Sequence, residues 1–492
     1  MRRPFALACT AQTGLALTGL ALASLGGCAL GPPTRAPDLR LPAAYEAPKT
    51  EAAADPASLA QWWSLYDDPQ LQALIEEALT HAPDAEIAAA RLVEARAVRA
   101  SALSAYDPQG EIQGSASRNQ TGVVSGVSSV NFGGYQVPLI TTTPIDTYSA
   151  QFDVSWEIDL FGRRRAARKK AEADLAAARF DYAATRTSLA ANVADSLFQA
   201  RGLAIQLDDA RESARIQHEL ADVAEKKFIH GLGARADADQ AAAQDAQAQA
   251  EIEDLQSQLH AARRSLLVLV GRGADPLDSL PTPAVAGTPP PAPVSVPAAL
   301  LASRPDVREA AQQLISASGQ FKLDELALFP TFTLQPGVGL SSSVELGAAT
   351  TTDMWQVGVG LVQPVLNLPQ LEDEIHAQGA RVDQAALTYQ KTVQTAYSEA
   401  ENALVELASD EARVRLLTDG EARARAALDS ERKGYAAGVV SLTDVLTAET
   451  TWRSARTELT SAQIQALRRS VQAFKALGGG WTPPGPMKQA TR

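Results

Sequence analysis

The stretch QFDVSWEIDL, residues 151–160, alternates strictly between polar and apolar side chains. Alternation with a period of two predicts a β-strand that has one apolar and one polar face. The apolar face carries Phe152, Trp156 and Ile158, and the polar face carries Asp153, Glu157 and Asp159. The segment MWQVGVGLVQP repeats the pattern, with Trp355 and Val357 on its apolar side.

Four strands are expected, in hairpins at about residues 109–161 and about 331–366, although the first strand, from about Glu111, alternates poorly. Two-faced runs of about ten residues are typical of transmembrane β-barrels and match the length that crosses a bilayer when tilted. An antiparallel sheet packed on a soluble core has the same period. Signs of export, together with the lack of any sequence suited to cover the apolar face, favour lipid. The expected lipid-facing residues are Phe152, Trp156, Ile158, Trp355 and Val357, and the expected lumen residues are Asp153, Glu157 and Asp159.

Long helices are predicted to follow the hairpins. No proline occurs between Pro144 and Pro276, so one helix is expected from about residue 163 to 230 and a return helix over about 235–271. A second pair is expected over about 371–433 and about 441–477. A helix of the first length is roughly 100 Å long. Helical patterns of this length indicate coiled-coil or spanning structure.

The chain is predicted to be a tandem duplication. Gly231 matches Gly438 and Asp237 matches Asp444, both at an offset of 207 residues. The first repeat is assigned to 58–271, the proline-rich linker PTPAVAGTPPPAPVSVP belongs to 272–297, and the second repeat is assigned to 298–478. A tail of glycine and proline follows at 479–492.

The amino terminus resembles a secretory leader. Basic Arg2 and Arg3 precede an apolar stretch that ends in LGGC, and this ending resembles the bacterial lipobox. Residues 1–27 are therefore predicted to be a signal peptide, with lipid attached to Cys28 and an extended tether over 28–57. The alternative is an uncleaved anchor helix.

Composition and motif content argue against several classes of protein function. The net charge of −13 argues against binding nucleic acid. The mean hydropathy of −0.11 argues against a bundle of membrane helices. The sequence has neither a phosphate-binding loop nor a nucleophile elbow, and its five histidines lack metal-ligand spacing. We therefore expect no enzyme activity, no cofactor and no metal site.

Four strands cannot close a barrel, and an open sheet edge in hydrocarbon is costly. Two chains would give eight strands, whose interior is filled by side chains, whereas three would give twelve, enough to enclose water. A homotrimer is the better prediction for a conduit.

Several motifs, in order along the chain, resemble the outer-membrane efflux protein family, the TolC-like exit ducts, and most of all their lipoprotein branch of the NodT and OprM type. The motifs are WWSLYDDPQLQALIEEAL, SWEIDLFGRRRAA, RPDVREAAQQLISA, LALFPTFTLQPGVGLSS and GVVSLTDVLTAE. The resemblance implies an α+β membrane protein: duplicated long helical hairpins form a periplasmic α-barrel, and four strands per chain join a trimeric 12-stranded transmembrane β-barrel. It also implies a passive duct in the outer membrane of a Gram-negative bacterium, served by a periplasmic adaptor and an inner-membrane RND pump.

Each long helix is expected to turn back into its return helix at a glycine, Gly231 in the first repeat and Gly438 in the second. The resemblance implies that these glycine reversals are the periplasmic tips. Adaptor contact is expected at Gly231, Leu232, Gly438, Val439 and Ser441. A helix C-cap, at which glycine is common, is the simpler explanation and is compatible with contact.

A gate is expected beside the tips. In a trimer, Asp237 and Asp444 would each form a ring of carboxylates, although an acidic residue at a helix start ordinarily stabilises the helix dipole. Arg432 and Lys433, near Tyr435, are expected to form bridges that hold the tip closed.

The expected gate departs from the family pattern at three positions. Ala436 stands where relatives often have Arg, and Thr443 and Thr447 stand where OprM-like members carry gate Leu and Asp residues. Easier opening is therefore expected.

The main rival interpretation is a periplasmic adaptor lipoprotein. Such a protein also has long helices and a lipidated cysteine, but it is expected to have one helical hairpin, whereas this chain has two and a duplication. A fibrous periplasmic coiled coil would lack the alternating segments around Trp156 and Trp355.

Overall fold

The computed structural model describes residues 39–47, 56–120, 129–138, 144–291, 297–345 and 347–482. The lipid attachment residue predicted from the sequence, Cys28, lies outside the described residues. The chain divides into two compact units. The described part of one unit comprises Ala105–Ala167 and Ala317–Ala386, and the other unit contains most of the helices.

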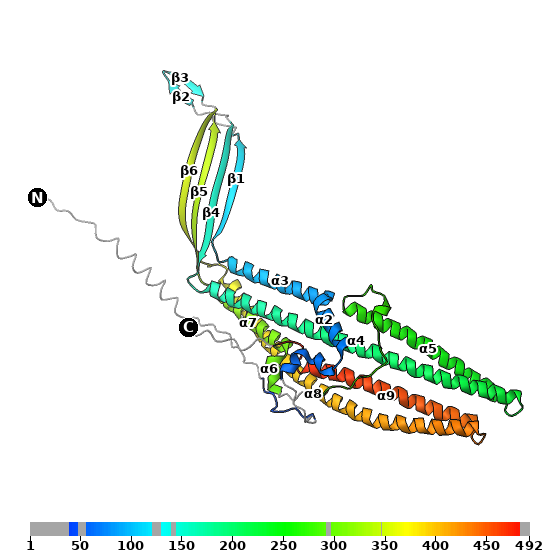
Figure 1. Cartoon of the computed structure of the whole chain (residues 1–492). Helices are drawn as coiled ribbons and strands as arrows, with labels where there is room; N and C mark the ends of the chain where they lie inside the picture. The colour runs from blue at the N-terminus through cyan, green and yellow to red at the C-terminus, as the bar shows by residue number, and fades with distance from the viewer. Residues whose placement is uncertain are drawn as a thin grey trace. The chain divides into compact units, whose positions relative to one another are not determined.

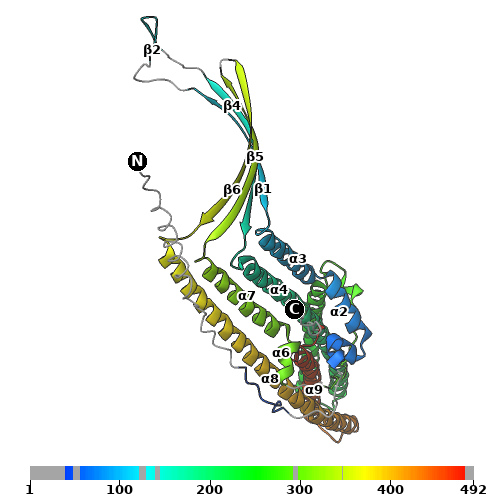
Figure 2. The ribbon, with the colours of Figure 1, turned by 90° about the vertical axis from the view of Figure 1, so that its left-hand side faces the viewer.

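The first unit is built around a four-stranded antiparallel sheet in the order β1-β4-β5-β6 (Figure 2). Each hairpin of the sequence supplies two neighbouring strands, and β4 pairs with β5 to join the two hairpins. The strands are β1 (Gln109–Asn119), β4 (Ile145–Ile158), β5 (Thr331–Glu345) and β6 (Ala348–Val362). A separate small hairpin, β2 (Ser129–Phe132) and β3 (Tyr135–Pro138), lies within the β1–β4 connection.

The helices follow the two repeats. Two helices are very long, α4 (Arg163–Ile229) with 67 residues and α8 (Leu368–Ala436) with 69. Each is followed by a return helix of 35 residues, α5 (Arg235–Leu269) and α9 (Leu442–Ala476). Figure 1 shows α4 beside α5 and α8 beside α9. No helix in the described part of the chain combines the length and the hydrophobicity of a membrane-crossing helix.

Shorter helices precede each hairpin of the sheet. In both repeats a proline occupies the first turn of the helix leading to the strands, Pro83 in α3 and Pro305 in α7, where its missing N–H costs nothing. These helices are η1 (Pro56–Tyr66), α2 (Pro69–His81), α3 (Pro83–Ser104), α6 (Leu300–Ser303) and α7 (Pro305–Leu326), with short 3-10 turns η2 (Leu277–Ser279) and η3 (Pro297–Ala299).

An aromatic cluster forms the largest core of the second unit. Trp62, which is fully buried, stacks on Phe474 with ring centroids 5.8 Å apart. Tyr66 packs against both Phe198 and Phe474, and its hydroxyl bonds the Ser470 hydroxyl at 2.5 Å. The motif WWSLYDDPQ therefore fastens η1 onto α4 and α9.

The duplication is visible in the helix ends. At Gly231 and Gly438 the backbone has φ of 73° and 78°, and the N–H of the next residue returns to a carbonyl five residues earlier, at 2.8 Å for Leu232 and 3.0 Å for Val439. This is the Schellman motif, which favours glycine because its left-handed conformation strains other residues. The ends of α5 and α9 repeat it at Gly271 and Gly478.

Gly271 and Gly478 also lie in equivalent close contacts with backbone atoms of another segment. A Cβ on Gly271 would lie 2.7 Å from the His81 carbonyl oxygen, and one on Gly478 would lie 2.5 Å from the Ser303 carbonyl oxygen. Both neighbours are backbone atoms that cannot rotate away. Each return helix therefore ends against the chain just before the helix that leads to the strands.

We predict that Gly478→Ala destabilises the protein by roughly 1–3 kcal/mol, because the new methyl group adds a backbone clash to a strained φ. Thermal unfolding in detergent measures the change. Gly379→Ala is the matched control: Gly379 lies inside α8, and its Cβ would meet Phe321 at an ordinary 3.5 Å. Equal midpoints for the two variants would contradict the prediction.

Candidate functional site

The four-stranded sheet has one apolar face. The register places Phe152 between Ile112 and Val338, and Val338 opposite Trp355, so these four side chains form a row across the sheet. Trp156 begins a second row, with Leu334 and Val359 beside it. Phe152, Trp156, Trp355 and Val357 are exposed in the single chain, while Ile158 is partly buried. This extended apolar surface marks an interaction face, because soluble monomers rarely expose one of this kind.

The opposite face is polar and acidic. Asp153 lies directly opposite Glu111, a residue that the sequence patterns did not single out. Gln151 donates a hydrogen bond to the Asp153 carboxylate at 2.8 Å. Glu157 also lies on this face and has Arg163 3.6 Å away. Like charges directly opposite each other across strands repel, so this face is suited to water or cations.

The prediction for Asp159 needs correction. Strand β4 ends at Ile158, and Asp159 belongs to the turn that leads into α4. Its carboxylate accepts hydrogen bonds from the backbone N–H groups of Gly162, Arg163 and Arg164 at 2.7, 2.8 and 3.1 Å. Asp159 therefore caps the long helix, because free N–H groups and the positive end of the helix dipole attract a carboxylate.

Both outer strands of the sheet have a free side. In the order β1-β4-β5-β6, strands β1 and β6 each pair with one neighbour among the described strands. The unpaired row of N–H and C=O groups along each is a template for pairing with another strand.

The two helix reversals expose apolar residues at their ends. Leu232 and Val439, which follow the two Schellman glycines, are 78% and 79% exposed. Behind them lies a buried cluster that includes Leu220, Val445 and Trp452. The reversals are therefore supported from inside and present apolar side chains at the surface, with Ile229 also exposed at the first of them.

Tyr435 and Lys227 connect the two reversals. The Lys227 ammonium lies 3.5 Å from the centroid of the Tyr435 ring and donates a hydrogen bond to the Tyr435 carbonyl oxygen at 3.3 Å. Tyr435 is buried, and this burial, together with the Asp237 charge, raises the pKa of its phenol. The sequence pattern indicates Tyr435 and Asp237 but not Lys227, because the repeat counterpart of Lys227 is Gly434.

Asp444 and Ser441 form a capping box at the start of α9. The Asp444 N–H donates to the Ser441 hydroxyl at 3.2 Å, and the Ser441 N–H donates to the Asp444 carboxylate at 3.2 Å. The N-cap residue of α5 is Ala234, which provides no side-chain cap. The two reversals thus share their glycine geometry but differ in their caps.

The remaining predicted gate residues have partners within the chain or lie on helix ends. Arg432 donates to Glu219 of α4 at 2.8 Å, and Lys433 lies in the last turn of α8. Thr447 donates its hydroxyl to the Thr443 carbonyl oxygen at 2.8 Å, within α9. The Arg432 bridge therefore runs between α8 and α4 of one chain.

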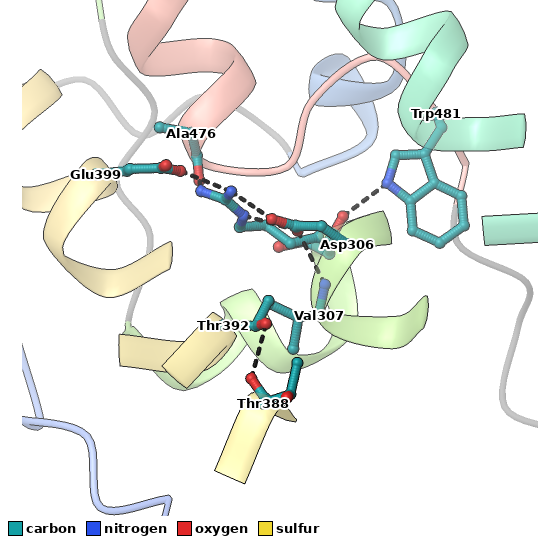
Figure 3. Close-up of polar contacts among 9 residues, drawn as sticks. Asp306, Val307, Thr388, Thr392, Glu399, Ala476 and Trp481 are labelled. Atoms are coloured by element: carbon teal, nitrogen blue, oxygen red, sulfur yellow. Dashed lines mark hydrogen bonds and ion pairs between the residues drawn. The ribbon is translucent and has the colours of Figure 1, made fainter. Parts of the chain in front are cut away.

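A buried arginine organises the other end of the helices. Arg304 donates to Asp306 at 2.6 Å, to Glu399 at 2.7 Å and to the Ala476 carbonyl oxygen at 3.2 Å (Figure 3). Burial lowers the pKa of this guanidinium, but the two carboxylates outweigh burial and raise it overall. The motif RPDVREA, one of those carrying the family resemblance, thus holds α7, α8 and α9 together.

Comparisons with known proteins agree with this geometry. The model of the family described as Outer membrane efflux protein matches residues 74–272 and 296–479, most of both repeats. The chain belongs to the outer membrane efflux protein family. This efflux protein is 28% identical over 436 residues to the pyoverdine export outer membrane protein OpmQ of Pseudomonas aeruginosa, covering 87% of this chain and 89% of OpmQ. It is 25% identical over 440 residues to the cation efflux system protein CusC of Escherichia coli, covering 87% and 90%.

Solved structures show the same fold. The outer-membrane channel OprN superposes with a TM-score of 0.73 at 26% identity, covering 92% of this chain and all of OprN. The open state of the MtrE outer membrane channel of Neisseria gonorrhoeae gives 0.77 at 24% identity, covering 91% and 97%. The family and these relatives identify this efflux protein as an outer-membrane efflux channel of a Gram-negative bacterium.

One contact of this efflux protein between α4 and α5 is predicted to depend on pH. His218 lies 3.1 Å from the Asp245 carboxylate, and this hydrogen bond and charge raise the pKa of the imidazole above its ordinary value. The pairing therefore stabilises the hairpin fully below about pH 6.5 and is lost as pH rises through the raised pKa.

We predict that Asp245→Asn moves the pKa of His218 down toward the ordinary value, as measured by NMR of labelled histidine. Asp254→Asn is the matched control, because Asp254 lies on the same helix and accepts from Gln258 instead. A His218 pKa that is the same in both variants would overturn the assignment.

Proposed function

We propose that three copies of this chain assemble into a passive exit duct with a 12-stranded transmembrane β-barrel. The observation that carries the proposal is a four-stranded sheet with one exposed apolar face and two unpaired edges. In hydrocarbon each unpaired backbone group costs several kcal/mol, so strands that span a membrane close into a barrel. Pairing β1 of one copy with β6 of the next removes every edge at twelve strands.

The two faces of the sheet suit the two sides of such a barrel. The rows around Phe152 and Trp156 face lipid, which solvates apolar side chains. Asp153, Glu157 and Glu111 face the lumen, where water and cations offset their charges. The passage is accordingly mildly selective for cations.

The helices continue the duct through the periplasm. With three copies, four long helical segments per chain form a hollow cylinder, the periplasmic α-barrel. The duct performs no chemistry of its own: an inner-membrane pump of the RND type and a periplasmic adaptor drive drugs or other small compounds through it. Relatives named for pyoverdine export and for cation efflux show that one architecture carries chemically different cargoes.

The exposed ends of the helix reversals form the adaptor contact. Leu232 and Val439 offer apolar side chains at the two tips, and the Schellman glycines Gly231 and Gly438 hold the backbone there in a fixed turn. Ser441 is the N-cap residue of α9 at the same tip. Three copies present six such tips, two from each chain.

The same region forms the gate. Trimerisation turns Asp237 and Asp444 into two rings of carboxylates around a narrow throat, which favours cations. Two contacts hold the reversals of each chain together in the closed duct. One is the cation–π contact of Lys227 with Tyr435, and the other is the ion pair of Arg432 with Glu219. Thr443 and Thr447, on the first turns of α9, are uncharged and add no further bridge.

We predict that detergent-purified protein has the native mass of a trimer and gives small cation-selective currents in planar bilayers. The double variant Asp237→Asn, Asp444→Asn is expected to raise the conductance and lower the cation selectivity, because it removes six charges from the throat. Ser441→Ala is the control that removes the cap of α9 and keeps the charge. A monomeric native mass without current would refute the duct. A trimer whose conductance and selectivity are unchanged by the two Asp substitutions would show that these residues do not form the gate.

We also propose that residues 1–27 are a signal peptide and that Cys28 carries lipid. Cys28→Ser is predicted to abolish incorporation of labelled palmitate and to reduce the amount of protein in outer-membrane fractions. Cys9→Ser, within the leader, is the matched control and leaves labelling unchanged. Palmitate on the Cys28→Ser protein would contradict the assignment.

A further inference from the structure

A polar pocket of about 490 Å³ lies among α4, α8 and α9 of one chain, at the end of α9 that is remote from the tips. Ligand pockets in proteins have volumes of roughly 300–1,000 Å³. The lining consists of four cationic side chains, three anionic ones, three amides and two alanines. Arg304, with Glu399 and Ala476, forms one wall (Figure 3). Such a lining suits a small charged solute rather than an apolar one.

The three carboxylates of the pocket are already paired with arginines. The pairs are Arg468 with Asp195 at 2.7 Å, Arg304 with Glu399 at 2.7 Å and Arg469 with Glu406 at 2.6 Å. The fourth cation is Lys475, whose ammonium has no hydrogen-bond or ion-pair partner within the described part of the chain. A protein with a net charge of −13 therefore has a pocket with one unpaired positive charge.

Further hydrogen-bond donors line the same pocket as the Lys475 ammonium. Arg468 uses Nε and Nη2 on Asp195, and a guanidinium has five N–H donors, so others remain for a ligand. The side-chain amide of Gln472, which lies one turn before Lys475 on the same face of α9, adds two donors. An anion with several oxygens can accept from these groups together, and charge-assisted hydrogen bonds are roughly twice as strong as neutral ones.

The fold of the repeat does not require the cations of α9. At the offset of 207 residues, the equivalents of Arg468, Arg469 and Lys475 in α5 carry no charge: they are Ala261, Ala262 and Val268. Helix α5 nevertheless has the same length of 35 residues as α9 and ends in the same glycine motif. The basic cluster is therefore a feature of the second repeat alone, which indicates a role beyond folding.

In the proposed duct, the pocket lies on the lumen side of α9. Positions that are multiples of seven residues apart keep the same side in helices that supercoil around one another. Arg468 and Lys475 follow Thr447 by 21 and 28 residues, and the two glutamines of the pocket follow Asp444 by the same spacings. Asp444 and Thr447 border the proposed throat. Another side of α9, which includes Phe474, packs in the aromatic core with η1.

We propose that this cationic pocket binds small anionic solutes inside the duct through their carboxylate or phosphate oxygens, with Lys475 as the principal contact. The proposal rests on the duct proposed above and deepens it, because it identifies a chemical class of solute and the residues that contact it. A single ammonium with neighbouring amides binds weakly, and a conduit requires weak binding because a solute must leave as well as enter.

The cationic pocket is electrostatically separate from the carboxylates of the throat. Asp444 and Lys475 are 31 residues apart in one helix, which is roughly 46 Å at 1.5 Å per residue. Exposed charges are screened beyond about 8 Å at physiological ionic strength. A substitution at Lys475 is therefore expected to change the handling of anions without changing the gate.

Equilibrium dialysis of detergent-purified protein against labelled inorganic phosphate tests the pocket, which a single chain forms. The wild-type protein is expected to bind phosphate saturably, with one site per chain. Lys475→Gln is expected to weaken binding by roughly tenfold or more, because it removes the unpaired charge, whereas Lys475→Arg retains most of the affinity. Citrate is expected to displace the phosphate, and its failure would remove carboxylates from the proposed class.

Lys169→Gln is the matched control for the dialysis, because it removes the same charge from an exposed position of α4 that is 26 residues from Asp195. An equal loss in both variants would show general attraction of anions and overturn the inference, as would binding that Lys475→Gln leaves unchanged. A lysine in the last turn of a helix can simply stabilise the helix dipole, a role that predicts no saturable phosphate site. Both variants are expected to unfold at similar temperatures.

Recording in planar bilayers tests whether the pocket faces the lumen. Lys475→Gln is expected to lower the permeability to phosphate relative to potassium, as measured by the reversal potential in a gradient of potassium phosphate, and Lys475→Arg to restore it. The expected change is opposite in sign to that for the double variant Asp237→Asn, Asp444→Asn. A conducting trimer whose phosphate permeability is the same with Lys475→Gln would overturn the inference and leave the duct intact. A monomeric native mass would overturn the duct, and the lumen position of the pocket with it.

Discussion

Backbone hydrogen bonding is the constraint on which the rest of this channel depends. Every N–H and C=O group that enters hydrocarbon needs a partner inside the protein, and the four strands leave two rows without one. Within the described part of a single chain, the four strands pair with one another, but the outer edges of β1 and β6 have no partner strand. In the proposed trimer further copies close this sheet, so that the apolar row with Phe152 and Trp355 faces lipid and the acidic face with Asp153 faces the lumen.

The helical part of the molecule consists of two repeats with the same backbone geometry at their helix ends. The same Schellman reversal occurs at Gly231 and Gly438, and the same close approach of a helix end to backbone occurs at Gly271 and Gly478. Backbone geometry is thus conserved between the repeats, while side chains are free to differ. Those differences, such as a capping box at Ser441 but not at Ala234, make the two halves chemically distinct.

Different contacts hold the two ends of the long helices. At one end, Arg304 binds two carboxylates and a helix-end carbonyl, and Trp62 is fully buried within its aromatic cluster. At the tips, the buried apolar cluster that includes Leu220, Val445 and Trp452 joins the two reversals, and Lys227 on the Tyr435 ring and the exposed ion pair of Arg432 and Glu219 add little further stability.

The sequence by itself determined the features that arise from local period and local backbone geometry: the two faces of the strands around Trp156 and Trp355, the long proline-free helices, and the glycine reversals. Tertiary structure decided the roles that depend on which distant residues meet. Asp159 continues the alternating pattern yet caps α4, because the strand ends at Ile158, two residues before the pattern does. Lys227 reaches Tyr435 across 208 residues of chain, and Glu111 faces Asp153 across a hairpin. The period of a sequence predicts the face of the helix or strand on which a residue lies. The residue that it contacts there depends on packing and strand register, which involve distant segments of the chain.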